Sequence, residues 1–135
     1  MSIVVGYVLS PEGDAALDAA IGEAKLRGLG LFVLHSSRGG YAESEEEILA
    51  YRAAGAAIRE RLSHEGIEYE VHGYVLGNPP SRDVLRVAQD QNAELIVIGI
   101  RRRSRVGKLI LGSTAMEILL DAPCPVLAVR APGAD

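Results

Sequence analysis

Short apolar segments alternate with longer amphipathic ones along this chain. Residues 2–9, 31–34 and 95–99 are nearly continuous in apolar residues, which is typical of strands buried on both faces of a parallel sheet. Residues 126–129 form a further apolar segment near the end, which we interpret as a fifth strand. Residues 67–76 instead alternate apolar and polar side chains. That alternation predicts an edge strand with one partly exposed side.

The intervals between these segments carry apolar residues at helical spacing. The first interval begins with Ser10-Pro11-Glu12-Gly13, a turn and helix start, and ends at residues 28–30, where glycine favours a helix stop. The second helix is expected to begin at the carboxylates of residues 43–47 and to run to about residue 64. The third ends near residue 92, and the fourth ends at Ala122-Pro123. The helix faces are marked by Leu17, Ala20, Ile21, Ala24, Ile48, Tyr51, Ile58, Leu62, Val84, Leu85, Ala88, Gln91, Ala115, Ile118, Leu119 and Ala122.

Five strands alternating with four helices predict an α/β fold. The expected architecture is a single three-layer α/β/α domain around a doubly wound parallel sheet with right-handed connections. We expect this domain to span residues 1–130, with a short flexible tail at 131–135. Ligands of such sheets bind beyond the carboxyl ends of the strands, near the switch in strand order. The ends of the first and fourth strands, residues 8–10 and Gly99, are therefore expected to face one cleft.

The composition narrows the function classes. With 135 residues, 48% hydrophobic and 24% charged, the chain has the composition of one folded domain. Its net charge of −4 argues against a general nucleic-acid binder, because nonspecific binding depends on basic charge. No apolar stretch approaches the roughly 20 residues that span a bilayer, and the single cysteine agrees with a reducing compartment. We therefore expect a cytoplasmic protein whose partner is neither a membrane nor a nucleic acid.

Two residues with reactive side chains are interpreted as structural. Cys124 lies between Pro123 and Pro125 at the entrance to an apolar strand, so we expect a small packed hydrophobe rather than a reactive thiol. His35 ends the second strand, and no Ser, Cys or metal-ligand partner is identifiable for it. A packed or hydrogen-bonded histidine is therefore expected there rather than a catalyst.

The stretch from Gly99 to Thr114 carries the most chemical information. A buried strand, a basic loop containing glycine and a Gly-Ser-Thr helix start follow one another there. α/β proteins build phosphate sites from these parts, because the first N–H groups of a helix lack intrahelical acceptors. The pattern indicates an anion or nucleotide-phosphate site, with a solvated surface loop and a docking patch for an acidic macromolecule as alternatives. Five of the 14 basic residues lie in this loop: Arg101, Arg102, Arg103, Arg105 and Lys108.

The chain resembles the universal stress protein family over almost its whole length. The resemblance is carried by Ile3-Val4-Val5-Gly6 with Ser10-Pro11-Glu12, by Leu95-Ile96-Val97-Ile98-Gly99, and by Gly112-Ser113-Thr114 through Ala122-Pro123-Cys124-Pro125-Val126-Leu127. It implies a sheet in the order 3-2-1-4-5 and a homodimer formed through the last strand, Val126–Val129. The family divides into members that bind nucleotides and members that do not.

In nucleotide-binding members the loop reads Gly-x2-Gly-x9-Gly-(Ser/Thr). Gly99 and Gly112-Ser113 match the first and last positions, whereas Arg102 occupies the second glycine position. The family's usual aspartate at the first strand, which meets the nucleotide near the ribose or metal, corresponds to Val8. The resemblance implies ATP or another adenine nucleotide with Mg²⁺, neither of them required for folding. The residues implied to bind it are Gly99, Arg102, Arg103, Arg105, Gly112, Ser113, Thr114 and Ser10.

Two functions from different classes follow from these residues. One is a homodimeric stress-response protein that binds ATP or a related adenine nucleotide between the first and fourth strand ends. The other is a dimeric interaction module without nucleotide, in which Val8 and Arg102 mark the loss of the site. A hydrolase is a third interpretation, but no general base or nucleophile is evident, so ATP hydrolysis is expected to be slow and incidental at most.

Overall fold

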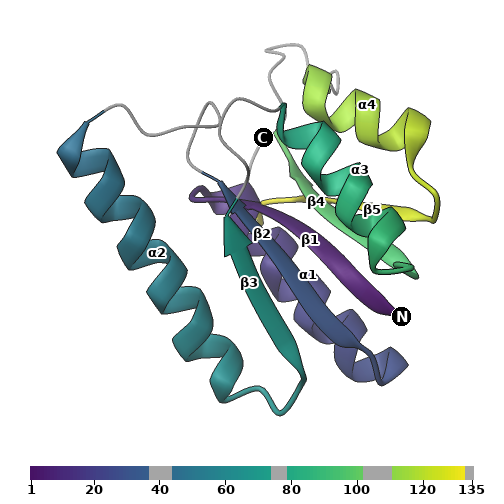
Figure 1. The fold of residues 1–135 in the computed structure, drawn as a ribbon, viewed down its shortest axis with the longest axis horizontal. Helices are drawn as coiled ribbons and strands as arrows, with labels where there is room; N and C mark the ends of the chain where they lie inside the picture. The colour runs from purple at the N-terminus through teal and green to yellow at the C-terminus, as the bar shows by residue number, and fades with distance from the viewer. Residues whose placement is uncertain (37–43, 74–78, 102–110, 133–135) are drawn as a thin grey trace.

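The computed structural model describes residues 1–36, 44–73, 79–101 and 111–132. Strands and helices alternate within these ranges, as Figure 1 shows. The elements are β1 (Ser2–Val8), α1 (Pro11–Arg27), β2 (Gly30–Ser36), α2 (Glu45–Ser63), β3 (Tyr69–Gly73), α3 (Pro80–Asp90), β4 (Leu95–Ile100), α4 (Ser113–Asp121) and β5 (Val126–Arg130).

The described strands form one parallel sheet with the order β3-β2-β1-β4-β5. β1 lies at its centre, with Val8 opposite Ser36 of β2 and Gly6 opposite Ile98 of β4. The predicted α/β class and the strand order 3-2-1-4-5 are therefore confirmed. Because all strands run the same way, the carboxyl ends of β1, β2 and β4 lie at one edge, and the order reverses between β1 and β4.

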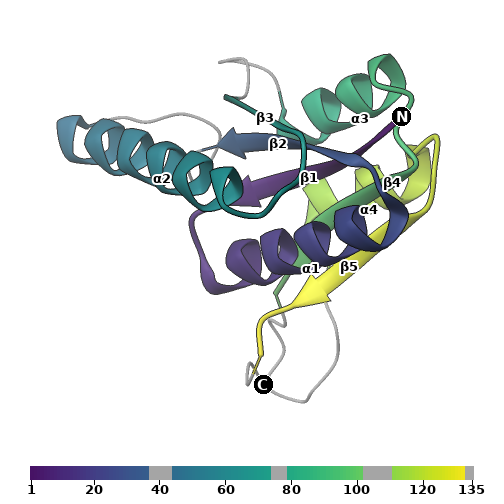
Figure 2. The same cartoon turned by 90° about the horizontal axis from the view of Figure 1, so that it is seen from below.

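The sheet divides the core into two layers. Alternate residues of a strand point to opposite faces, so Ile3 and Val5 pack with α1 and α2, whereas Val4 packs with α3 and α4. All three side chains are fully buried. Figure 2 shows α1 and α2 on one side of the sheet and α3 on the other. Burial on both faces explains why the sequence of β1 is almost uniformly apolar.

β3 confirms the predicted edge strand but differs from it in extent. The strand begins at Tyr69, two residues later than predicted, and residues 74–76 of the predicted segment lie outside the described ranges. Val71 is buried while its neighbours Glu70 and His72 are exposed, as an edge strand requires. β5 forms the opposite edge, where Leu127 is exposed.

Two helix residues predicted on buried faces are instead exposed. Ile48 of α2 and Leu119 of α4 have exposed fractions of 40% and 39%. α2 buries residues only from its middle onward, including Ile58 and Leu62, and its first turns project beyond the sheet in Figures 1 and 2. Helical spacing identifies one face of a helix, but the overlap of the helix with the sheet decides how much of that face is buried.

The expectation for Cys124 is confirmed. The residue is partly buried and packs against the core between the sheet and α3 and α4. Burial raises the pKa of its thiol, which favours the unreactive protonated form. Of the predicted tail, residues 133–135 lie outside the described ranges, so its flexibility stays a prediction. No helix in the described part of the chain has both the length and the apolar character needed to cross a bilayer.

Candidate functional site

Two helices begin at the carboxyl edge of the sheet where the strand order reverses. α1 follows β1, and α4 follows β4, with residues 102–110 between them outside the described ranges. This edge is where doubly wound sheets bind ligands. The chemistry available at the edge depends on how the first backbone N–H groups of α1 and α4 are satisfied.

The N-terminus of α1 is capped by its own sequence. Ser10 is the N-cap, and its Oγ accepts a hydrogen bond from the Gly13 N–H at 3.0 Å and donates one to the Val8 carbonyl at 3.1 Å. Pro11, the first helical residue, has no N–H to satisfy. Ser10, which the family resemblance implies as a nucleotide ligand, is therefore engaged in capping α1. Only its remaining lone pair is open to another donor.

Glycine at two positions lets α1 approach β1 and β4 closely. A Cβ atom on Gly13 would lie 1.9 Å from the Val8 carbonyl oxygen, and one on Gly99 would lie 2.3 Å from the Glu12 carbonyl oxygen. Backbone atoms block a side chain at both positions. Gly99 is therefore required by the packing of α1 on β4, so the glycine at this position of the loop pattern does not by itself indicate phosphate binding.

An ion pair between Glu12 and Arg101 connects the start of α1 to the residue after β4. Arg101 donates from Nε and Nη2 to Oε1 of Glu12, at 3.2 and 3.0 Å. Burial raises the pKa of the Glu12 carboxyl, but the hydrogen bond to its own backbone N–H and the Arg101 guanidinium lower it below its usual value. Glu12 is thus ionised at neutral pH. Sequence reasoning placed Arg101 in the basic loop but missed this partner, because no local spacing links residues 12 and 101.

The N-terminus of α4 has the opposite character. Its N-cap is Gly112, which provides no side-chain cap, and the first intrahelical bond is the one from the Met116 N–H to the Gly112 carbonyl at 3.0 Å. The N–H groups of residues 113–115 therefore have no acceptor within the helix. Ser113 and Thr114 are exposed, and the first turn holds no acidic residue. A Cβ on Gly112 would meet no atom of the described residues within 4 Å.

Comparison with known proteins identifies the family. The model of the universal stress protein family matches residues 1–130. The chain belongs to this family. A universal stress protein from Mycolicibacterium smegmatis is 39% identical over 132 residues, which are 97% of this chain and 98% of the relative.

Solved structures of the family share the fold. The structure of a universal stress protein from Archaeoglobus fulgidus aligns with a TM-score of 0.77 and 38% identity, and covers 95% of this chain and 97% of that one. A second A. fulgidus structure, of the universal stress protein in complex with dAMP, aligns with a TM-score of 0.71 and 33% identity over 95% and 96% of the two chains. Family members related to this chain at that level include one bound to an adenine nucleotide.

The family's loop pattern is only partly within the described residues. Gly99, Gly112, Ser113 and Thr114 lie at the two ends of the loop. Arg102, Arg103 and Arg105 fall in the range 102–110, outside the described residues, so their part in the site stays a prediction. At the end of β1, where nucleotide-binding members carry aspartate, Val8 is half-buried and the next residue, Leu9, is 56% exposed.

Proposed function

We propose that this universal stress protein binds an adenine nucleotide, ATP or a relative of it, at the carboxyl edge between β1 and β4. The observation that carries the proposal is the uncapped N-terminus of α4, formed by Gly112, Ser113 and Thr114. Its first N–H groups, which have no acceptor within the helix, and the positive end of the helix dipole favour a phosphate there. The universal stress protein of A. fulgidus that is 33% identical was determined with dAMP.

The surroundings of Gly112 support the proposal. A phosphate can approach the backbone there, because no atom of the described residues would lie within 4 Å of a Cβ on Gly112. The hydroxyls of Ser113 and Thr114 are exposed beside it and can donate to phosphate oxygens. Arg102, Arg103 and Arg105 supply positive charge to the same loop in the proposal, in a chain with an otherwise acidic balance.

The residues of this chain support a bound Mg²⁺ less than they support a bound nucleotide. The described residues hold no group of three side chains able to ligate a metal ion, and Val8 stands where nucleotide-binding members carry a carboxylate. Mg²⁺ is commonly bound through substrate phosphates with few protein ligands. We therefore propose that any Mg²⁺ enters with ATP and is held mainly by its phosphates.

The substitution Gly112→Asp separates binding from folding. An aspartate at this N-cap would satisfy a free N–H group and stabilise the fold by about 0.5–1 kcal/mol. Its carboxylate would repel the nucleotide phosphates and weaken binding about tenfold or more. Isothermal titration with AMP and with ATP, with and without Mg²⁺, measures the affinity, and urea unfolding measures the stability.

Gly22→Asp is the matched control for that experiment. It adds the same charge on an exposed helix position of α1 where a Cβ meets nothing within 4 Å. Nucleotide affinity should stay close to that of the wild type in this variant. Absence of AMP and ATP binding by the wild type at millimolar concentration, together with no nucleotide in the freshly purified protein, would reject the proposal.

A dimeric interaction module is the second candidate, favoured by the apolar surface on the β5 side. Leu127 on the edge strand β5 is exposed, and Met116 and Leu120 on α4 are exposed by 46% and 76%. We propose a homodimer through β5, which would cover this edge.

Native mass spectrometry measures the oligomeric state and the retained nucleotide in one experiment. A monomer would exclude the dimer, and nucleotide binding that appears only after Val8→Asp and Arg102→Gly would favour a module that has lost its site.

We also infer a cytoplasmic location, supported by the single unpaired cysteine. ATP hydrolysis is not part of the proposed function, because His35 is neutral, stacked on Tyr51 and tilted against Tyr7, rather than paired with a nucleophile among the described residues. Phosphate release no faster than the buffer blank is the expected result for the wild type and for Ser113→Ala.

A further inference from the structure

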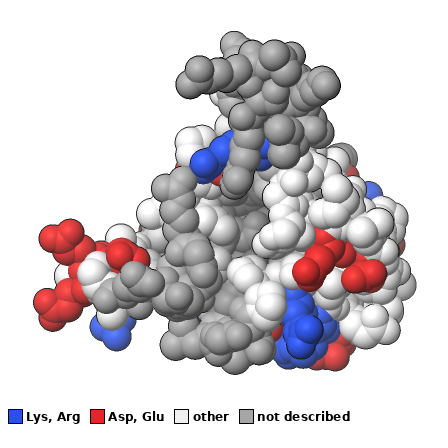
Figure 3. Space-filling model, turned by 90° about the horizontal axis from the view of Figure 1, so that it is seen from above, with Lys and Arg blue, Asp and Glu red and all other residues white. Residues whose placement is uncertain are grey.

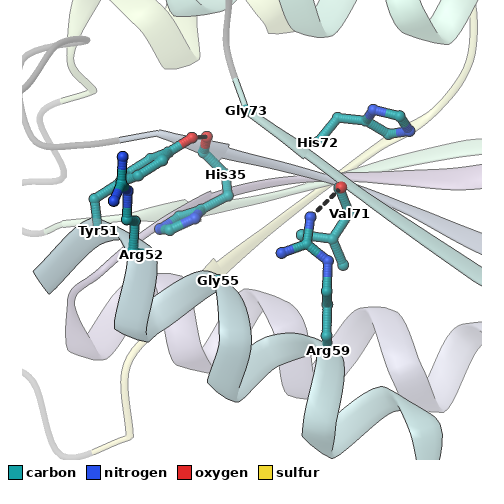
Figure 4. A pocket seen from close by; sticks show the side chains of 8 residues that line it. All are labelled: His35, Tyr51, Arg52, Gly55, Arg59, Val71, His72 and Gly73. Atoms are coloured by element: carbon teal, nitrogen blue, oxygen red, sulfur yellow. Dashed lines mark hydrogen bonds between the residues drawn. The ribbon is translucent and has the colours of Figure 1, made fainter. Parts of the chain in front are cut away.

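A pocket of about 310 Å³ lies between α2 and the carboxyl ends of β2 and β3. It is separate from the edge between β1 and β4 where the nucleotide is proposed to bind. Figure 4 shows Gly55 on α2 with His35 and Arg59 to either side, and Tyr51 and Arg52 on the His35 side. The volume is at the lower end of the range for small-molecule sites.

His35 supplies a buried polar group to this pocket. The residue is only 3% exposed, and its ring stacks on Tyr51 with centroids 4.2 Å apart and contacts Tyr7 at 5.5 Å. The Tyr51 hydroxyl donates to the His35 backbone carbonyl at 2.9 Å. The imidazole nitrogens themselves have no hydrogen-bond partner among the described residues. Because these nitrogens are not among the fully buried side-chain atoms that lack a partner, they are accessible from the pocket that His35 lines and can bond a ligand or water there.

His35 is uncharged at neutral pH but can still donate a hydrogen bond. Burial, and then the nearby Arg59 guanidinium, lower its pKa to about 4. At pH 7 the ring is therefore neutral, with one N–H to donate. Among the described lining residues, Arg52 and Arg59 provide positive charge.

Arg52 and Arg59 are seven residues apart on α2 and carry this charge. Neither has a carboxylate partner among the described residues, whereas Arg61, on the same helix, contacts Asp18 and Glu65. Arg59 uses Nη2 to donate to the Val71 carbonyl at 2.9 Å, which holds its guanidinium at the pocket. Its other N–H groups remain available as donors.

The described carboxylates on the elements next to the pocket are directed elsewhere. Glu70 of β3 is engaged by His72 at 3.1 Å. The residues 45–47 of α2 lie in its first turn, at the tip that projects from the body in Figure 3. No acidic residue is present among the described residues that line the pocket. Their polar side chains therefore present donors and positive charge without an anion from the described part of the chain.

Gly55 keeps the space between His35 and Arg59 open. A Cβ there would lie 3.4 Å from His35 Nδ1 and 3.6 Å from Arg59 Nη1, ordinary contact distances. Alanine would thus fit but would occupy the middle of the pocket. Glycine within a helix is unfavourable relative to alanine, and its presence here coincides with the pocket.

We propose that this pocket binds the oxyanion group, phosphate or carboxylate, of a small organic molecule. Arg59 pairs with the anion, the imidazole N–H of His35 donates to it, and Arg52 adds positive charge at the rim. Arginine suits this role because its planar donors match the geometry of carboxylate and phosphate oxygens. The site is independent of the nucleotide proposed at α4.

NMR titration of the full chain at pH 7 tests the site, with inorganic phosphate and acetate as probes and choline chloride at equal ionic strength as the control. We expect saturable shifts of the His35 ring and Gly55 amide resonances with one or both anions and none with choline. The stronger of the two anions identifies the headgroup. The amides of residues 113 and 114 report binding at α4 separately, so failure at one site leaves the other result intact.

Variants decide which groups bind. Arg59→Gln should weaken the anion about tenfold and Arg52→Gln about threefold. Arg61→Gln removes the same charge from the same helix and should change affinity less than twofold. An equal loss in Arg61→Gln, or no saturable shift at tens of millimolar of either anion, would overturn the proposal.

Gly55→Ala provides a test in a protein that stays folded. The substitution should raise stability, as Gly22→Ala on the exposed face of α1 should also do, because alanine favours helix. Only Gly55→Ala should abolish the shift of the His35 ring with anion. An unchanged titration in Gly55→Ala would contradict the proposed position of the anion.

Discussion

α1 and α4 begin at the same edge of the sheet but differ in how their first N–H groups are capped and in the charge of their first turns. At α1, Ser10 caps the Gly13 N–H and Glu12 places an ionised carboxylate in the first turn. At α4, Gly112 offers no cap and the first turn holds no acidic residue. The helix dipole is the same in principle at both termini. The start of α1 is capped by Ser10, whereas the first N–H groups of α4 have neither a side-chain cap nor an acceptor within the helix.

The two glycines that match the family's loop pattern differ in the same way. Gly99 lies under α1, where any side chain would collide with the Glu12 backbone, whereas a Cβ on Gly112 would meet none of the described residues within 4 Å. A glycine at the first position is thus needed to build the fold. The glycine at the last position is free for a ligand, so it carries more information about function.

Alanine substitution at these two glycines should give the largest difference. We expect Gly99→Ala to lower the free energy of unfolding by about 2–3 kcal/mol, because α1 must move away from β4. Gly112→Ala should cost below about 1 kcal/mol, the usual difference at an N-cap. Urea unfolding of both variants measures the contrast. Equal losses would show that α1 does not require glycine at position 99.

Replacing the serine at each helix start should affect a different property, stability at Ser10 and nucleotide binding at Ser113. Ser10→Ala removes the cap of α1 and should destabilise the protein by about 1 kcal/mol. Ser113→Ala removes no protein contact among those described and should leave the stability almost unchanged while weakening AMP binding severalfold. Thermal unfolding and AMP titration on each variant give both readouts. A loss of stability in Ser113→Ala similar to that in Ser10→Ala would contradict the distinction between the termini.

The Glu12–Arg101 ion pair should contribute the smallest effect. Its surface exposure limits the contribution to well under about 1 kcal/mol. Because the pKa of Glu12 is lowered in the folded protein, the contribution is present at neutral pH and is lost as the pH falls below the usual carboxyl value of 4.5. Unfolding of wild type and Glu12→Gln at pH 7 and near pH 3 should differ more at pH 7. A constant difference would exclude this titration.

The repeated strand and helix pattern predicted the fold because burial on both faces requires apolar strands such as β1 and β4. The same pattern could not determine that Ile48 and Leu119 are exposed, since the overlap of a helix with the sheet depends on distant elements. The sequence contained only weak indications of the pocket between α2 and the ends of β2 and β3. Gly55 within a helix and Arg59 without a carboxylate at helical spacing were present, but neither indicates a cavity until β2 and β3 are placed beside α2.

The sequence by itself determined the α/β class, the approximate positions of the strands and the Gly-Ser-Thr start of α4, because these depend on residue patterns a few positions long. The family resemblance added the strand order, which the structure confirms. Only the tertiary structure decided that Gly99 is fixed by α1, that Glu12 holds Arg101, and that His35 and Arg59 share a pocket. These contacts join residues 12, 35, 59, 99 and 101 across different elements, and no local periodicity encodes such distances.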